Sequence, residues 1–131
     1  MLRLLVPLLV LLSAPVFADA PMTGDEFDAR MTGKTMTYAE AGQVYGTEQY
    51  LPGRQVIWAF SGDECRKGTW YQDGPAICFL YEDNPDAQCW LFFQRSDGLK
   101  AHFTGDREGT ELSAVNESER PLSCAGPDLG V

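Results

Sequence analysis

The stretch AICFLYEDNPDAQCWLFF, residues 76–93, decides how this chain is expected to fold. It holds two short apolar runs, each with one cysteine, separated by an acidic loop that contains a proline. If residues 82–85 form a four-residue loop between antiparallel strands, Cys78 lies directly opposite Cys89. Side chains that face each other across such a pair are close enough for a disulfide. The stretch therefore predicts a β-hairpin stapled by Cys78 and Cys89.

The chain has four cysteines, and an even number in a small exported domain indicates two disulfides. Spacing alone allows three connectivities. The hairpin register favours Cys78–Cys89, which leaves Cys65–Cys124 and a loop of roughly sixty residues. Zinc is the rival interpretation, but no C-x-x-C pair is present and the single histidine, His102, is distant in sequence. We expect no metal and no cofactor.

Export is predicted by residues 1–18, which combine one basic residue, a short apolar run and a small residue at the end. We interpret them as a signal peptide cleaved after Ala18, because the apolar run is too short to cross a bilayer. Residues 19–131 then form a single domain without a membrane span, and the predicted location is the periplasm. An uncleaved anchor is the alternative.

The chain is acidic, with a formal net charge of −9 for the whole sequence. Loss of Arg3 with the signal peptide would leave nine basic residues against nineteen acidic ones. Such a surface repels phosphate backbones and anionic headgroups, which argues against nucleic acid as a partner. The charge would steer cationic partners toward the protein, or it simply keeps an exported protein soluble.

The fold class predicted is mainly β, an antiparallel up-and-down meander of about eight strands that forms a small barrel or half-barrel. Short β-favourable runs fill residues 34–116 and are separated by Gly-, Pro- and Asp-rich turns. One short helix is predicted within residues 22–33, where Thr23 and Glu26 form a capping box. Its Phe27 and Met31 must dock on the sheet. Residues 117–131 are expected to be an irregular tail.

Alternation along the strands assigns two faces. With a loop at residues 72–75, Trp70, Ile77 and Trp90 share one row of the core face. The aromatic residues that could instead line a ligand pocket are Trp58, Trp70, Phe79, Trp90 and Phe92. The cysteine-bearing face carries Tyr71, Leu80, Leu91 and Phe93, and it is apolar enough to need a cover. The helix, a ligand or a protein partner could supply that cover.

Catalytic chemistry has few candidates. His102 is predicted on the polar side of a strand, near Ser96, Asp97 and Asp106 in sequence. The acidic pairs considered for catalysis lie in predicted turns, at residues 63–64, 82–86 and 106–108, where carboxylates are typically solvated or cap the turn. Residues 82–86 could bind calcium weakly, although they lack the alternating spacing of a dedicated loop.

The chain resembles a family of small exported bacterial proteins of unknown function. The resemblance rests on TGDEF, MTGKTMTY, YGTEQYLPGR, GTWY, ICFLYE, QCWLFF and GTEL, which span most of residues 23–112. It implies an exported, disulfide-containing β-domain and no particular activity. A weaker similarity to lipocalin-like barrels rests on the meander pattern, and a shared fold does not license a function.

We therefore expect a non-enzymatic binding module of the cell envelope. Its partner would be a small apolar ligand in an aromatic cavity, or an envelope protein on the second apolar face. The alternatives are an envelope enzyme that uses turn carboxylates and His102, and an inhibitor-like protein that presents the loop at residues 82–86.

Overall fold

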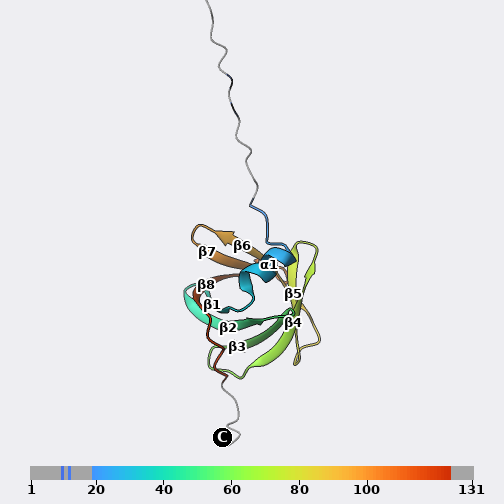
Figure 1. Ribbon diagram of the computed structural model, residues 1–131, viewed down its shortest axis with the longest axis vertical. Helices are drawn as coiled ribbons and strands as arrows, with labels where there is room; N and C mark the ends of the chain where they lie inside the picture. The colour runs from blue at the N-terminus through green and yellow to red at the C-terminus, as the bar shows by residue number, and fades with distance from the viewer. Residues whose placement is uncertain (1–9, 11, 13–18, 125–131) are drawn as a thin grey trace, which may run out of the picture.

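The structure is a closed antiparallel barrel of eight strands with one short helix, as the strand pattern predicts (Figure 1). The computed structural model describes residues 10, 12 and 19–124. The predicted signal peptide, apart from residues 10 and 12, and the end of the predicted tail at 125–131 lie outside the described residues. The elements are α1 (Gly24–Met31), β1 (Thr35–Glu40), β2 (Gln43–Leu51), β3 (Gln55–Phe60), β4 (Arg66–Asp73), β5 (Ala76–Tyr81), β6 (Gln88–Arg95), β7 (Gly98–Phe103) and β8 (Glu111–Ser118).

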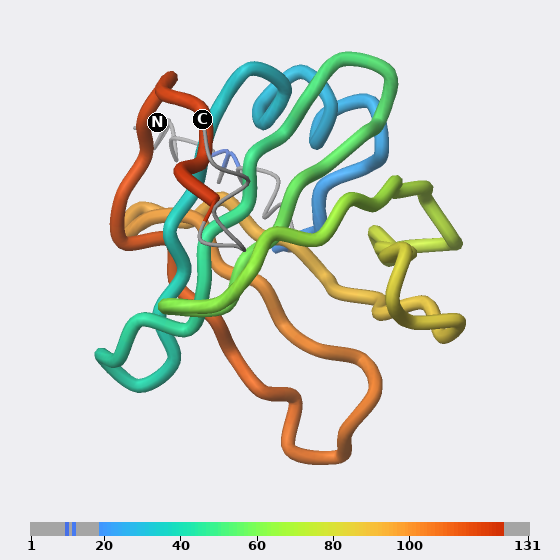
Figure 2. The backbone as a smooth tube through the Cα atoms, turned by 90° about the horizontal axis from the view of Figure 1, so that it is seen from below, coloured from blue at the N-terminus to red at the C-terminus, as the bar shows by residue number. Residues whose placement is uncertain are grey.

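Every strand pairs with its neighbours in sequence, and β8 pairs with β1 to close the sheet. Closure removes the two free edges that an open sheet would expose. The β2–β3 turn lies beside α1, whereas the β1–β2 and β7–β8 turns lie at the far end (Figure 2). The barrel therefore has a helix end and a loop end.

Helix α1 begins with the predicted capping box: the Thr23 side chain accepts from Glu26 N–H, and the Glu26 carboxylate accepts from Thr23 N–H. It is two residues shorter at each end than the predicted range of 22–33. Phe27 and Met31 are buried, but they face the barrel interior and not the outer cysteine face. The Phe27 ring packs against Trp70 at 4.9 Å between centroids. The helix thus closes one end of the barrel.

Both predicted disulfides are present, Cys78–Cys89 and Cys65–Cys124. In the β5–β6 hairpin Cys78 pairs with Cys89 and Ile77 with Trp90, which is the register that the loop length predicts. The second disulfide fastens the segment after β8 to the loop before β4. Two disulfides indicate an oxidising compartment.

The β4–β5 hairpin differs from the sequence prediction. Asp73 pairs with Ala76, so the loop holds two residues and not four. Trp70 consequently lies opposite Phe79, two places from the predicted Ile77. Gly74 has a φ of 55°, a left-handed conformation that glycine adopts without steric cost and that tight hairpin turns require. The shift of two residues changes the row but keeps Trp70 on the inner face.

No helix among the described residues combines the length and apolar character needed to cross a bilayer.

Candidate functional site

The loop end of the barrel contains a cavity of about 350 Å³. It opens beside Phe60 and Asp83, both of which are exposed to solvent, and its walls are mainly aromatic. Phe79 and Phe92 separate it from Phe27 of α1, because both rings line the cavity and pack against that side chain. One end of the barrel is thus filled, and the other holds a volume typical of a small-ligand site.

Four of the five aromatic residues considered for a pocket line this cavity: Trp58, Phe79, Trp90 and Phe92. The fifth, Trp70, belongs to the filled end. Its ring contacts Phe27, and the Arg54 guanidinium lies 4.5 Å from the ring centroid. The structure therefore brings the four side chains together and places Trp70 in the packing beneath α1.

Glu48 is the only buried charged residue among the described residues, with 2% of its surface exposed, and it lines the cavity. Both of its carboxyl oxygens lie within hydrogen-bonding distance of the Tyr81 hydroxyl, at 3.0 and 2.9 Å. Burial raises the pKa of Glu48 well above its ordinary value, and the bond from Tyr81 opposes this only in part. Burial therefore favours the protonated form of this carboxyl group.

Two further buried phenols complete a polar cluster, which we define as Tyr38, Glu48, Tyr50 and Tyr81. The Tyr38 and Tyr50 hydroxyls are 2.7 Å apart and hydrogen-bonded. Burial raises the pKa of both, and a charge on Glu48 would raise them further. The cluster draws on β1, β2 and β5, and all four residues line the cavity.

A β-bulge brings a fourth tyrosine into the cavity wall. In the β1–β2 ladder Tyr38 pairs with Gly46 and Ala39 with Val44, so Tyr45 has no partner there. Its ring packs against Trp58 at 5.7 Å. Gly46 makes room for that indole, because a Cβ at this position would lie 2.3 Å from the Trp58 ring. Bulges often redirect a side chain at functional sites, and here the redirected residue is aromatic.

Arg66 stands at the cavity mouth. Its guanidinium donates to Asp83 through Nε and to Asp63 through Nη2, the latter at 3.1 Å. Its Cζ atom lies 5.0 Å from the centroid of the Phe60 ring. The Nη1 atom is buried and has no hydrogen-bond partner among the described residues. Two turn carboxylates therefore converge on one cation, which balances part of their charge.

The proposed partner face is only partly available. Tyr71 and Leu80 are 43% and 41% exposed, whereas Phe93 is 8% exposed and Leu91 is half-buried. Phe93 is covered by polar side chains: the His102 ring lies 5.0 Å away between centroids and the Arg95 guanidinium 4.8 Å away. The cover on this side is a set of strand residues and not α1.

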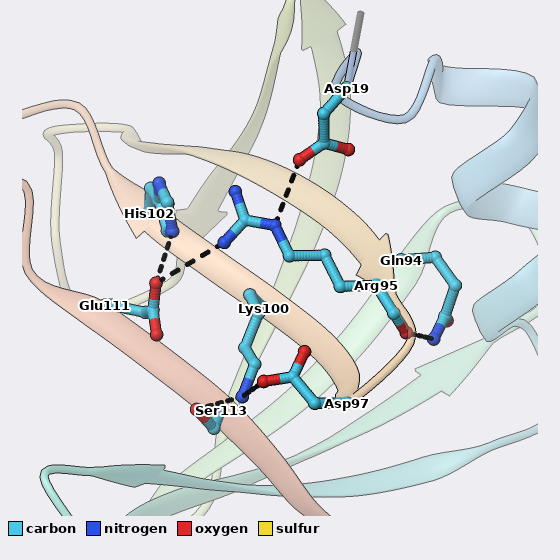
Figure 3. A network of polar contacts seen from close by, with 8 residues as sticks. All are labelled: Asp19, Gln94, Arg95, Asp97, Lys100, His102, Glu111 and Ser113. Atoms are coloured by element: carbon cyan, nitrogen blue, oxygen red, sulfur yellow. Dashed lines mark hydrogen bonds and ion pairs between the residues drawn. The ribbon is translucent and has the colours of Figure 1, made fainter. Parts of the chain in front are cut away.

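His102 belongs to a polar network on the outside of the barrel (Figure 3). Its Nε2 lies 2.6 Å from a Glu111 carboxylate oxygen on the neighbouring strand. Arg95 joins this pair at 3.8 Å and donates to Asp19 at 3.0 Å (Figure 3). His102 is thus paired with Glu111, and not with the residues near it in sequence, and it does not line the cavity.

Two other turn carboxylates, those of Asp106 and Glu82, accept hydrogen bonds from nearby groups. Asp106 accepts from the Thr110 hydroxyl at 2.7 Å and from two backbone N–H groups, and these bonds lower its pKa. Glu82 accepts from Lys67 N–H, and Asn84 accepts from Asp86 N–H. Within residues 10, 12 and 19–124, no group of three or more His, Cys, Asp and Glu side chains is arranged to hold a metal ion.

The polar cluster was not among the residues singled out from the sequence. A signal for it exists in QVYGTEQYL, because strict alternation puts Gly46, Glu48 and Tyr50 on one side of the strand. A carboxylate at an inward position between a glycine and a tyrosine is unusual. Its convergence with Tyr81, 33 residues away, depends on the closed barrel.

Comparison of the chain with protein-family models, curated proteins and solved structures found no match.

Proposed function

We propose that this protein is a periplasmic, non-enzymatic binding module of the cell envelope that takes a small ligand with an apolar body into the loop end of its barrel. The observation that supports it is the cavity of about 350 Å³, which is open at one end and walled by aromatic side chains. Small-molecule sites typically combine such walls with a few converging polar groups. This mode of binding would resemble that of lipocalin-like barrels.

The proposed location rests on two observations of different kinds. The two disulfides need an oxidising compartment, and residues 1–18 have the pattern of a signal peptide. A periplasmic protein meets both conditions.

A ligand is favoured over the other functions by where the candidate residues lie. His102 and Glu111 form a pair and neither lines the cavity, which argues against an enzyme that uses them on a cavity-bound substrate. Phe93, one of the four residues of the apolar face expected for a protein partner, is covered by Arg95 and His102. The loop at residues 82–86 forms part of the cavity mouth through Asp83 and Asn84.

Fluorescence titration with N-phenyl-1-naphthylamine, a neutral apolar probe, tests the proposal. We expect the oxidised wild-type protein to bind it saturably. Ala101→Phe should weaken binding by about tenfold or more, because Ala101 lines the cavity and a phenyl ring there would fill it. Leu112→Trp is the second cavity-filling variant, in case the first does not fold.

Val115→Phe is the matched control, because Val115 is 57% exposed and does not line the cavity. It should bind the probe like the wild type, and circular dichroism should show that each variant is folded. Absence of saturable binding, or equal binding by a folded cavity-filled variant and the control, would overturn the proposed function.

A further inference from the structure

The Glu48 side chain has no cation to balance it among the described residues. The ion pairs of this part of the chain all involve other carboxylates, and the polar group that Glu48 does contact is a phenol. An ionised carboxylate in such a position is costly, because it is buried and only the Tyr81 hydroxyl contacts it. A ligand that brings a positive charge would offset that cost.

The surroundings of Glu48 suit a cation in a second way. Phenol and indole rings attract positive charge at their faces, and the attraction is stronger where water is excluded. Tyr38, Tyr50 and Tyr81 lie around the carboxyl group, and Tyr45 and Trp58 form the adjoining wall. An organic ammonium group would therefore meet a carboxylate and several aromatic faces in one cavity.

The charged residues at the cavity mouth are compatible with a cationic ligand. Arg66 is the one cationic residue of the cavity lining, and its Nε and Nη2 atoms are paired with Asp83 and Asp63, whereas Nη1 has no partner among the described residues. An anionic ligand would have to approach these two carboxylates and then lie beside Glu48. The chain as a whole is also acidic, at −9, which favours the approach of cations.

We infer that the ligand of this cavity is an organic cation, an ammonium group on an apolar or aromatic body, whose charge is neutralised by Glu48 and held against the tyrosine rings. The inference rests on the proposed function, since it names the chemical class of ligand for the same site. Binding would be linked to loss of the Glu48 proton. The other titratable groups of the cavity lining are Tyr38, Tyr45, Tyr50, Tyr81, Arg66 and Asp83. Burial raises the pKa of the four phenols further above neutrality.

Isothermal titration with benzyltrimethylammonium tests the inference, because this probe is positively charged at every pH. We expect its affinity to rise by up to about tenfold per pH unit while Glu48 is protonated in the free protein. Runs in two buffers of different ionisation enthalpy should show up to one proton released per probe bound. A proton would leave in this way only if binding ionises an acidic group.

Two comparisons test whether the affinity for the probe depends on Glu48 and on the positive charge of the probe. Glu48→Gln, which keeps the size of the side chain, should weaken binding of the cation by about tenfold or more and abolish its pH dependence. Glu108→Gln, at an exposed turn, is the control and should leave both unchanged. Neopentylbenzene has the shape of the probe without its charge and should bind the wild type and Glu48→Gln equally.

The outcomes separate this inference from the proposed function. If the neutral compound, or the anion phenylacetate, binds as tightly as the cation, or if Glu48→Gln binds the cation like the wild type, the inference is overturned while a ligand-binding role stands. An affinity that falls as the pH rises would point to a neutral ligand that accepts a hydrogen bond from protonated Glu48, and it also overturns the inference. If no probe binds, both the inference and the proposed function are overturned.

Discussion

Glu48 shows how one residue can conflict with the stability of its own barrel. It occupies an inward position between Gly46 and Tyr50 on β2, where an apolar side chain would pack without penalty. Burial instead raises the pKa of its carboxyl group and so favours the protonated form. A residue that costs stability and lines a cavity is more readily explained by a site than by packing.

The pH dependence of stability follows from this burial. The folded state keeps Glu48 protonated above its ordinary pKa of 4.5, whereas the unfolded chain loses the proton near that value. The contribution of Glu48 to the free energy of unfolding is therefore fully present below pH 4.5 and falls as the pH rises toward the folded-state pKa. The slope is at most about 1.4 kcal/mol per pH unit.

Urea denaturation between pH 5 and 8 measures this slope. Glu48→Gln cannot titrate, so its free energy of unfolding should fall less steeply with pH than that of the wild type. Glu108→Gln, at an exposed position, should follow the wild type. Parallel curves for the wild type and Glu48→Gln would contradict the burial of an uncompensated carboxyl group.

At the scale of elements, α1 acts as a lid on the filled end of the barrel. A helix of eight residues is unstable alone, and its stability comes from the aromatic side chains beneath it. Phe27 is completely buried and packs against Tyr50, Trp70, Phe79 and Phe92. The Gly24 N–H also donates to the Gln72 side chain at 2.7 Å, which ties the helix start to β4.

Two substitutions in this helix should have different magnitudes. Phe27→Ala should lower the free energy of unfolding by about 3–5 kcal/mol, because it leaves a cavity among four rings. Thr23→Ala removes only the capping bond to Glu26 and should cost about 1 kcal/mol. Denaturation curves monitored by tryptophan fluorescence measure both, and similar losses for the two variants would argue against the lid role.

At the scale of the whole molecule, closure of the sheet and one long-range disulfide hold the chain together. The β1–β8 pairing joins the first strand to the last. Cys65–Cys124 then links two residues 59 apart in sequence and fixes the segment after β8, whose Leu122 N–H also donates to Gln49. Constraining so long a loop reduces the entropy of the unfolded chain by more than the short Cys78–Cys89 loop does.

Removal of the long-range disulfide tests this account. Cys65→Ala with Cys124→Ala should lower the free energy of unfolding by about 4 kcal/mol in the chain-entropy model. Ser123→Ala, at an exposed position beside it, is the control and should change little. A loss below about 1 kcal/mol in the double variant would show that strain offsets the entropic gain, or that the unfolded chain is already compact.

Local pattern accounts for most of the fold. The eight strands, the helix cap and the Cys78–Cys89 pairing all follow from signals within about fifteen residues, namely alternation, turn residues and hairpin length. The inner or outer side of each strand residue follows from alternation too, which is why Trp58, Phe79, Trp90 and Phe92 could be selected as pocket candidates.

Alternation has a period of two, so a hairpin can slip by two residues without moving any side chain to the other face. This is why the row of Trp70 was predicted wrongly although its face was not. The same periodicity does not show which inward-facing residues contact one another. Glu48 and Tyr81 come together only because the sheet closes on itself. Closure also gives the barrel two ends, of which α1 fills one and leaves the other open. Local sequence set the faces of this barrel, and closure, by bringing distant strands to a common interior, created its cavity.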